Sequence, residues 1–296
     1  MKCNKVLRFL VAAAFLGGLT LHSLAQNLNG TLNSGFYGGP LAVQTVNTGF
    51  GNAAGGNDSA GGSELDAAYG QISGGYLYLF LAGNFENNGN HLNVFVAGGA
   101  AGQSTLALPA TGTMQAMNGS VFSPSFQATW AFDMNNYAGT LYSEEYSLTG
   151  TPSGGYVGAL GNSGTGLYAG SDGGVANLYL NNNHASTMGA AGTALSGATS
   201  GANATTGLEL VVPLSAIGYS GGNILVLADI NGGGDGYLSN QFLPGLPVGS
   251  DNPGGTTFNF GSTAGQYFTV AVPEPSTAAF LSLSGLAALM AFRKRS

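Results

Sequence analysis

Residues 224–230 read Ile-Leu-Val-Leu-Ala-Asp-Ile, and the glycine-rich residues 231–236 follow them directly. A short run of apolar, often β-branched residues that ends in turn-forming residues is typical of a β-strand. Comparable runs recur between clusters of Gly and Asn, at residues 76–81, 92–96, 126–132, 140–146, 175–180, 208–212, 256–260 and 267–272. Because no window shows sustained helical periodicity, we predict an all-β body, an antiparallel β-sandwich of jelly-roll-like form.

Glycine punctuates this pattern, with 52 of 296 residues, which is over twice its usual share of about 7%. The pairs Asn88-Gly89 and Asn118-Gly119 predict tight turns. Residues 150–174 and 186–207 are rich in Gly, Ser, Thr and Ala, so we expect long loops or flattened edge segments there. Neither stretch shows a fixed repeat, which argues against a β-helix.

The amino terminus has the order of a secretory signal peptide: a basic segment, a largely apolar run at residues 9–21, and then small residues. A signal peptidase needs small side chains three residues and one residue before the bond that it cuts, and Ser23 and Ala25 supply them. We therefore expect the mature chain to begin at Gln26. The alternative is a retained transmembrane helix, but the run is shorter than the ~20 residues that span a bilayer.

The carboxy terminus combines a proline-rich triplet, a short apolar stretch and a basic cluster. The residues are Val272, Pro273, Glu274 and Pro275, then the apolar residues 277–292, then Arg293, Lys294, Arg295 and Ser296. A helix over the apolar stretch would be about 24 Å long, so we expect a short transmembrane helix whose basic side chains reach toward the headgroups. Because Lys and Arg that flank a span stay on the cytoplasmic side, the body would lie outside.

This tail resembles the PEP-CTERM sorting domain of Gram-negative and related bacteria in its Pro273-Glu274-Pro275 triplet, its short apolar helix and its terminal Arg-rich cluster. The resemblance implies processing by an exosortase, a membrane cysteine enzyme thought to cut near the triplet, and delivery of the body to the cell envelope, surface or extracellular matrix. Signal peptidase and exosortase would be processing partners, and the tail would hold the membrane at least transiently. An ordinary tail anchor is the alternative. The expected parts are a signal peptide at residues 1–25, a body at 26–271 and a sorting tail at 272–296.

The body carries side-chain charge of one sign. All six Lys and Arg residues lie in the two ends of the chain, and of thirteen acidic residues only Glu274 lies in the tail, which leaves twelve in the body. Such a body repels phosphate backbones and anionic lipids, so we exclude nucleic acid as a partner and favour neutral polar ligands or divalent cations. The single cysteine, Cys3, lies in the signal peptide, so the mature body would have no disulfide.

Two parts of the body, residues 63–69 leading into 75–80 and residues 207–218, resemble strands of DOMON-like and family-9 carbohydrate-binding sandwiches. The resemblance implies a sandwich fold and a sugar held between aromatic rings. Trp130 is the single tryptophan and would stack on a sugar if it faced outward, with Tyr residues beside it. The alternative is that Trp130 faces the sandwich interior, which is the default for a large aromatic ring.

The strongest candidate for a metal site follows the strand at residues 224–230. Asp229, Asn231 and Asp235 offer oxygen ligands on a glycine-bent loop, which suits Ca²⁺. The segment departs from an EF-hand, because Gly233 takes a ligand position and Asn240 stands where a bidentate Glu is required. The alternative is a solvated hairpin loop that uses Asp and Asn for its turn geometry. A second, weaker oxygen cluster comprises Asn57, Asp58, Glu64 and Asp66.

The sequence shows no catalytic arrangement. Glu144 and Glu145 are neighbours on one expected strand, so they point to opposite faces, cannot flank one bond and should form a charged edge. His91 and His184 lack metal-ligand spacing, so we expect loop or strand-end roles for them. No Gly-x-Ser-x-Gly elbow supports a nucleophilic serine.

These features predict an exported, exosortase-sorted surface or matrix protein that is not an enzyme, requires no cofactor, and can bind extracellular polysaccharide with or without Ca²⁺. A rival function is that of an extracellular glycan-active enzyme, which would need two carboxylates converging in one cleft. Another rival is an ice- or surface-binding protein, which would need a flat Thr-rich face. Thr205-Thr206 and Thr256-Thr257 are too few to propose one.

The absence of Lys and Arg between Gln26 and Val272 predicts resistance to trypsin. Trypsin needs a cationic side chain in its specificity pocket, so the denatured mature body should survive as one band of undiminished size, whereas chymotrypsin should degrade it. Electrophoresis of extracellular material after digestion measures this outcome. If trypsin still trims the carboxy terminus of the extracellular form, the cut near the Pro-Glu-Pro triplet has not taken place.

Overall fold

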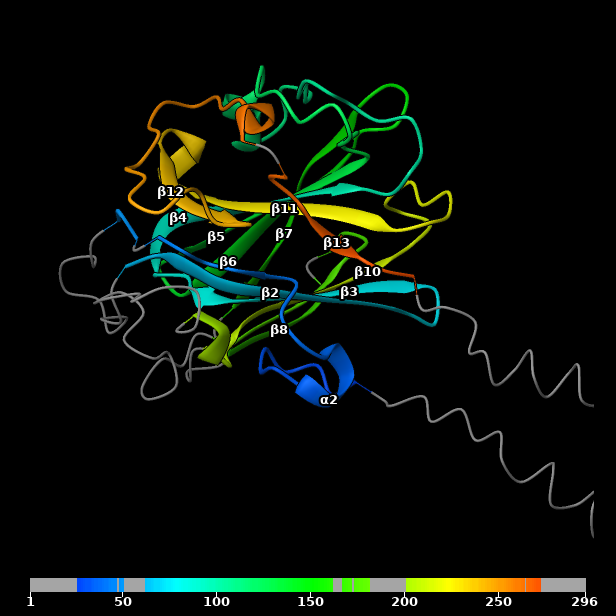
Figure 1. The fold of residues 1–296 in the computed structure, drawn as a ribbon, viewed down its shortest axis with the longest axis vertical. Helices are drawn as coiled ribbons and strands as arrows, with labels where there is room; N and C mark the ends of the chain where they lie inside the picture. The colour runs from blue at the N-terminus through cyan, green and yellow to red at the C-terminus, as the bar shows by residue number, and fades with distance from the viewer. Residues whose placement is uncertain are drawn as a thin grey trace, which may run out of the picture.

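Strands dominate the computed structural model, which describes residues 26–46, 48–50, 62–161, 167–171, 173–181, 201–263 and 265–272. They form two sheets, and every pairing between these strands is antiparallel (Figure 1). The first sheet has the order β1 (Ala42–Val43), β2 (Glu64–Ser73), β3 (Tyr76–Asn84), β10 (Gly207–Pro213), β9 (Asn177–Asn181) and β8 (Leu167–Ser171). The second has the order β12 (Leu238–Leu243), β11 (Ile224–Asn231), β4 (Asn88–Ala97), β5 (Trp130–Tyr137), β6 (Thr140–Ser147) and β7 (Ser153–Gly161), and β13 (Phe268–Val270) pairs with β11. The helical elements are short turns: α2 (Ser34–Tyr37), η1 (Met114–Met117), η2 (Gly201–Asn203), η3 (Gly233–Asp235) and η4 (Phe260–Ser262).

This architecture confirms the predicted all-β class, and side-chain alternation explains how the two sheets pack. On β4, Leu92, Val94 and Val96 join the main core, in which buried residues of both sheets meet. Their neighbours His91 and Asn93 point to the opposite face of the second sheet, because successive strand residues alternate. The main core thus lies between the two sheets, and the second sheet also has an outer face that points away from this core.

The outer face of the second sheet is covered by chain segments that lie far apart in the sequence. The segment between β4 and β5 carries η1 and Phe122, and the segment after β12 carries η4 with Phe260. Phe122 and Phe260 stack with ring centroids 5.5 Å apart, and Phe95 of β4 contacts both rings. In Figure 1 these segments lie above β11, on the side away from β2 and β3. Polar side chains beneath this cover are therefore buried.

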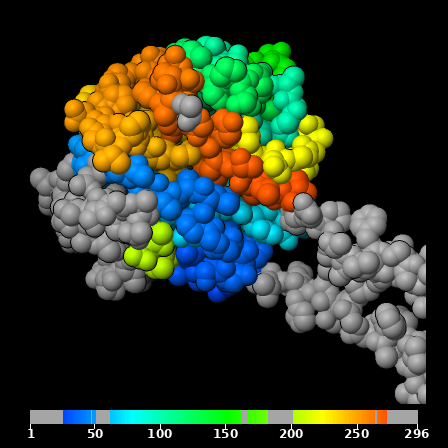
Figure 2. All heavy atoms as spheres, viewed as in Figure 1, coloured from blue at the N-terminus to red at the C-terminus, as the bar shows by residue number. Residues whose placement is uncertain are grey.

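The amino-terminal and carboxy-terminal parts of the body close one edge of the sandwich together. Beside β1, Gln44 Nε2 donates a hydrogen bond to the carbonyl of Phe242 in β12 (3.1 Å), and Thr45 Oγ1 donates to the carbonyl of Leu246 (2.9 Å). Figure 2 shows these parts, blue and orange, side by side on one face of the molecule. The bonds join an edge of the first sheet to an edge of the second.

The first described residues pack on the first sheet and are held there by Glu209 of β10. Its buried carboxylate accepts hydrogen bonds from Tyr37 Oη (2.7 Å) and from the side chain of Gln26. It also accepts from the backbone N–H groups of Asn29 (3.1 Å) and Gly30 (3.4 Å). One carboxylate thus orders the chain from Gln26 to α2.

Most predicted strands are present, and the departures have local causes. The predicted strand at residues 126–132 begins only at Trp130, and residues 256–260 lead into η4 because their aromatic rings cover the second sheet. Asn88-Gly89 lies at a register shift in β4 rather than in a turn, and Gly89 has a φ of 84°. The glycine-rich residues 150–174 supply the edge strands β7 and β8, in line with the flattened edge segments expected there.

Several predicted features lie outside the described residues. They are the signal peptide with Ser23 and Ala25, the polar residues Asn57, Asp58 and His184, and the tail residues Pro273, Glu274, Pro275, Arg293, Lys294 and Arg295. Gln26 and Val272 are among the described residues. Among the described residues, no helix is long and apolar enough to cross a membrane.

Replacing Glu209 by Gln should weaken the attachment of the amino-terminal segment. The amide keeps the size of the side chain but replaces one carboxylate oxygen by an NH₂ group. This group cannot accept a hydrogen bond from the O–H and N–H groups that face Glu209. We expect the free energy of unfolding, measured in urea, to fall by about 1–3 kcal/mol. The matched change Asp251→Asn, at an exposed acid, should stay within about 0.5 kcal/mol of the parent. Equal effects of the two substitutions would contradict the role of Glu209.

Candidate functional site

Polar side chains occupy two neighbouring rows across the outer face of the second sheet. The registers of β6, β5, β4 and β11 align Glu144, Asp133, Asn93 and Asp229 in one row and Tyr142, Asn135, His91 and Asn231 in the other. Directly opposed residues of antiparallel strands have Cβ atoms about 4.5–5.5 Å apart, so neighbours within a row are in reach of one another. The sheet therefore gathers residues from four strands into one site.

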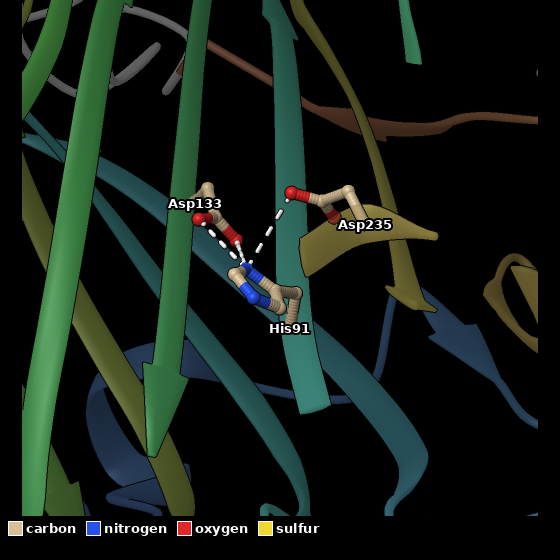
Figure 3. A group of neighbouring side chains, drawn as sticks. All are labelled: His91, Asp133 and Asp235. Carbon is tan, nitrogen blue, oxygen red and sulfur yellow. Dashed lines mark hydrogen bonds and ion pairs between the residues drawn. The ribbon is translucent and has the colours of Figure 1, made fainter. Parts of the chain in front are cut away.

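His91 lies at the centre of this site. Its Nδ1 is 2.9 Å from Asp133 Oδ1 and 3.5 Å from Asp235 Oδ2. Figure 3 marks these contacts of the His91 ring with both aspartates by dashed lines. Burial lowers the pKa of His91, but Asp133 and then Asp235 outweigh burial and raise this pKa to about 9. The charged ring donates from both nitrogens. The amide of Asn135 lies 3.2 Å from Nε2, and turning it would let its otherwise unpartnered Oδ1 accept that proton.

The three aspartates around His91 have pKa values above the ordinary range. Burial is the main cause for each, and His91 opposes it for Asp133 and Asp235. Asn93 Nδ2 donates to Asp235 Oδ1 (2.9 Å) and to Asp229 Oδ1 (3.3 Å). Within the described chain, the Oδ2 atoms of both residues have no hydrogen-bond donor. One imidazolium against three carboxyl groups leaves the site short of positive charge.

The structure brings together two of the three residues expected to bind Ca²⁺. Asp229 and Asp235 lie together because both accept a hydrogen bond from the Asn93 side-chain amide. Asn231 instead turns its Oδ1 to the backbone N–H groups of Gly232 (3.0 Å) and Tyr237 (2.9 Å), so it shapes the loop as the hairpin alternative requires. A Ca²⁺ ion bound here would find the carboxylates of Asp229 and Asp235, but the side-chain oxygen of Asn231 would not reach it.

Glu144 and Glu145 lie on opposite faces of β6, as predicted, but the expectation of a charged edge is wrong. Glu144 is 7% exposed and accepts from the N–H (2.7 Å) and Oγ1 (3.0 Å) of Thr113, the N–H of Met114 (3.2 Å) and Tyr146 Oη (2.7 Å). Glu145 accepts from two backbone N–H groups ahead of β9, at 3.0 and 2.9 Å. Both carboxylates are buried because they satisfy donors of loops that pack on β6.

A pocket of about 200 Å³ opens beside these groups. Its buried residues are His91, Asp133, Ser143 and Glu144, Asn135 is half-buried, and its exposed rings are Tyr142 and Tyr156. The tyrosine side chains are 38% and 59% exposed, and Tyr156 of β7 stands opposite Glu144 of β6. The pocket thus combines aromatic surface with hydrogen-bonding groups.

Trp130 lies away from this pocket. It is 2% exposed in the main core and stacks on Phe132, with ring centroids 5.9 Å apart. A ring between the two sheets cannot stack on an external sugar. The core alternative therefore describes Trp130, and the rings at the pocket are tyrosines.

His91, Asp133 and Asp235 could also hold a metal ion, because each offers a ligand atom and these atoms lie within 4.8 Å of one another. One imidazole nitrogen with carboxylate oxygens suits zinc or another transition metal better than Ca²⁺. The metal would have to displace the proton that Nδ1 shares with Asp133. The ion pair and a metal complex are thus alternative states of the same residues.

Sequence reasoning singled out Asp229 and Asp235 but missed Asn93 and Asp133, although a weak signal was present. Asn93 and Asp133 interrupt the apolar strands β4 and β5 at positions that alternate with core residues. Such a pattern ordinarily marks a solvent face, and nothing local to either strand indicates that other segments cover it. These residues are buried only because the segments that carry η1 and η4 pack over the outer face of the second sheet.

Comparisons with known proteins do not add to this chemistry. No protein-family model matches the chain. No curated protein and no solved structure matches it either. The resemblances of the tail and of the body remain predictions from the sequence.

The raised pKa values predict that the protein becomes less stable as pH rises. His91, Asp133, Asp229 and Asp235 bind protons more tightly in the folded chain than in the unfolded chain. Their contribution is present at low pH and is lost from near pH 4, where unfolded aspartates ionise, up to about pH 9, where folded His91 loses its proton. We expect the free energy of unfolding, measured in urea with a chelator, to fall across this range.

Asp229→Asn is the variant that tests the cause. The amide keeps the size of the side chain but cannot ionise, so it should flatten the pH dependence by on the order of 1 kcal/mol or more. Asp251→Asn is the matched control, because it also removes one carboxylate but from an exposed position. If the free energy of unfolding changes equally with pH in the parent and in both variants, the pH dependence does not come from the buried Asp229.

Proposed function

We propose that this chain is an exported, exosortase-sorted protein of the cell surface or extracellular matrix that binds a neutral sugar unit of a polysaccharide without cleaving it. The observation that supports binding is the pocket on the second sheet, where two exposed tyrosine rings stand beside buried hydrogen-bonding groups. Export and sorting are supported by the sequences of the two ends. The jelly-roll-like form of the body, between a signal helix and a short transmembrane helix, belongs to the same proposal.

Tyr142 and Tyr156 supply the apolar surface that a sugar ring needs. They lie on the adjacent strands β6 and β7 and keep a large part of each ring exposed. The C–H face of a sugar packs on an aromatic ring, and the phenol hydroxyl stays available as a donor or acceptor. Exposed rings beside a polar pocket therefore suit an amphipathic ligand such as a sugar.

The buried side of the pocket supplies directional hydrogen bonds. His91 and Asn135 offer N–H donors, and Asp133 offers carboxylate oxygens as acceptors. Sugar hydroxyls both donate and accept, so they can pair with either kind of group. A volume of about 200 Å³ is below the ~300–1,000 Å³ of pockets that enclose drug-sized ligands, which favours one sugar unit of a longer chain.

The negative charge at the pocket favours neutral glycans over acidic ones. Asp133, Asp235 and Glu144 lie in or beside the pocket, and the body has no Lys or Arg to attract an anion. An acidic sugar would bring a further negative charge to these carboxylates and would be repelled. We therefore expect neutral polysaccharides to bind in preference to acidic ones.

A glycan-active enzyme is the second candidate, and one observation favours it. Asp133 and Glu144 line the same pocket from directly opposed positions on β5 and β6. This arrangement meets the requirement for two carboxylates in one cleft. Against it, Glu144 accepts four hydrogen bonds, three of which hold the start of η1, and Asp133 is paired with His91. Carboxylates so engaged are poorly placed to exchange protons with a substrate.

Binding should depend on the pocket tyrosines. Tyr156→Ala should weaken the binding of a neutral polysaccharide by about tenfold, or ~1.4 kcal/mol, because stacking surface is lost while the buried groups stay in place. Tyr137→Ala removes a ring that is 57% exposed and does not line the pocket, so it should leave the affinity unchanged. Affinity electrophoresis against soluble neutral and acidic polysaccharides measures both effects.

The same panel separates the candidate functions. Failure of every neutral polysaccharide to bind, or equal losses in the two tyrosine variants, would overturn the binding proposal. Release of new reducing ends by the parent protein, abolished by Glu144→Gln, would establish the enzyme instead.

A further inference from the structure

Glu64 and Asp66 of β2 are buried charged groups that the pocket does not use. Both are 0% exposed, and none of their four carboxylate oxygens has a hydrogen-bond donor in the described parts of the chain. The body contains no Lys or Arg to neutralise them. They belong to the first sheet, whereas the tyrosine pocket lies on the second sheet.

Asn84 adds a further oxygen to this pair. The register of β2 and β3 places Asn84 directly opposite Glu64, so the two side chains are cross-strand neighbours. Asn84 Nδ2 donates to the carbonyl of Gly62 (2.9 Å), which fixes the orientation of the amide. Its Oδ1 is buried and, among the described residues, also lacks a donor. Five oxygens from three side chains therefore have no hydrogen-bond donor within the part of the chain that the structure describes.

An irregularity in β2 brings Asp66 into the group. The register shifts between Leu65 and Ala67, so Asp66 is the extra residue of a bulge. Bulges re-aim a side chain and recur beside functional sites. Burial, then the charge of Asp66 and then that of Glu86, raise the pKa of Glu64, an effect that needs Asp66 and Glu64 to be close.

We propose that Glu64, Asp66 and Asn84 form a binding site for one Ca²⁺ ion at β2 and β3. Two carboxylates in a dry interior are strongly unfavourable unless a partner compensates both charges. Ca²⁺ takes about 6–8 oxygen ligands, and these side chains supply up to five of them. Backbone carbonyls and water complete such sites in proteins.

Protons and Mg²⁺ would satisfy the oxygens of Glu64, Asp66 and Asn84 less well than Ca²⁺ does. Burial raises the pKa of both carboxyl groups, so protons occupy them in part when no cation is bound. Protonation removes the charge, but most of the five oxygens still lack donors. Mg²⁺ keeps several waters and demands octahedral geometry, so a buried group of carboxylates suits it poorly. The cluster on the second sheet differs, because His91 supplies its own positive charge.

Thermal unfolding of the mature body in a chelator and in about 1 mM Ca²⁺ tests the proposal. A ligand that binds only the folded state raises Tm, so the parent protein should gain several degrees in Ca²⁺. The double variant Glu64→Gln/Asp66→Asn should show no response to Ca²⁺. In the chelator it should be at least as stable as the parent, because it no longer buries two charges.

Asp229→Asn is the matched control, since it changes an equally buried aspartate on the second sheet. It should keep the full response to Ca²⁺. A parent Tm that ignores Ca²⁺, or a response that survives in the double variant and vanishes in Asp229→Asn, overturns the proposal.

Direct titration decides the matter if the double variant does not fold. Calorimetry of the parent and of Asp229→Asn with Ca²⁺ should then give the same single site in both proteins. The absence of binding heat and of a Tm shift in the parent overturns the assignment. Because the pocket tyrosines take no part, loss of glycan binding in Tyr156→Ala should leave the Ca²⁺ response intact.

Discussion

Burial of carboxylates in a body without Lys or Arg is the constraint on which this structure depends. Nine of the twelve acidic residues of the body are buried among the described residues: Glu64, Asp66, Glu86, Asp133, Glu144, Glu145, Glu209, Asp229 and Asp235. A buried carboxylate must find donors, a cation or a proton. The protein has one described histidine for this purpose, and Glu144, Glu145 and Glu209 instead take donors mainly from backbone N–H groups and hydroxyls.

This constraint explains how loops are attached to the sheets. Glu144 holds η1 over the second sheet, and Glu209 holds the first residues of the body on the first sheet. Once η1 and the segment that carries η4 are in place, their aromatic rings form a second core on the outer face. The cover then lowers the local dielectric around His91 and Asp133, which strengthens their ion pair and raises the cost of Asp229 Oδ2, which has no hydrogen-bond donor among the described residues.

The two sheets use their buried acids differently. On the second sheet, His91 and a network of hydrogen bonds keep the polar groups of the pocket in fixed positions, which suits recognition of a ligand. On the first sheet, Glu64 and Asp66 have neither a histidine nor a hydrogen-bond donor within the described residues. Binding of a cation there would compensate the charge and tie β2 to β3. Ligand recognition and cation binding would thus belong to separate parts of the sandwich.

The sequence by itself determined the features that depend on local pattern and composition. Alternating apolar residues indicated an all-β sandwich, and adjacency on β6 placed Glu144 and Glu145 on opposite faces, because strand residues alternate. The absence of Lys and Arg indicated neutral or cationic ligands. The tertiary structure alone decided which polar residues are buried, which row each joins, and that Asn231 turns to its own loop while Asp235 reaches His91. Burial and cross-strand register depend on contacts between segments far apart in the chain, and these contacts leave no local periodicity to read.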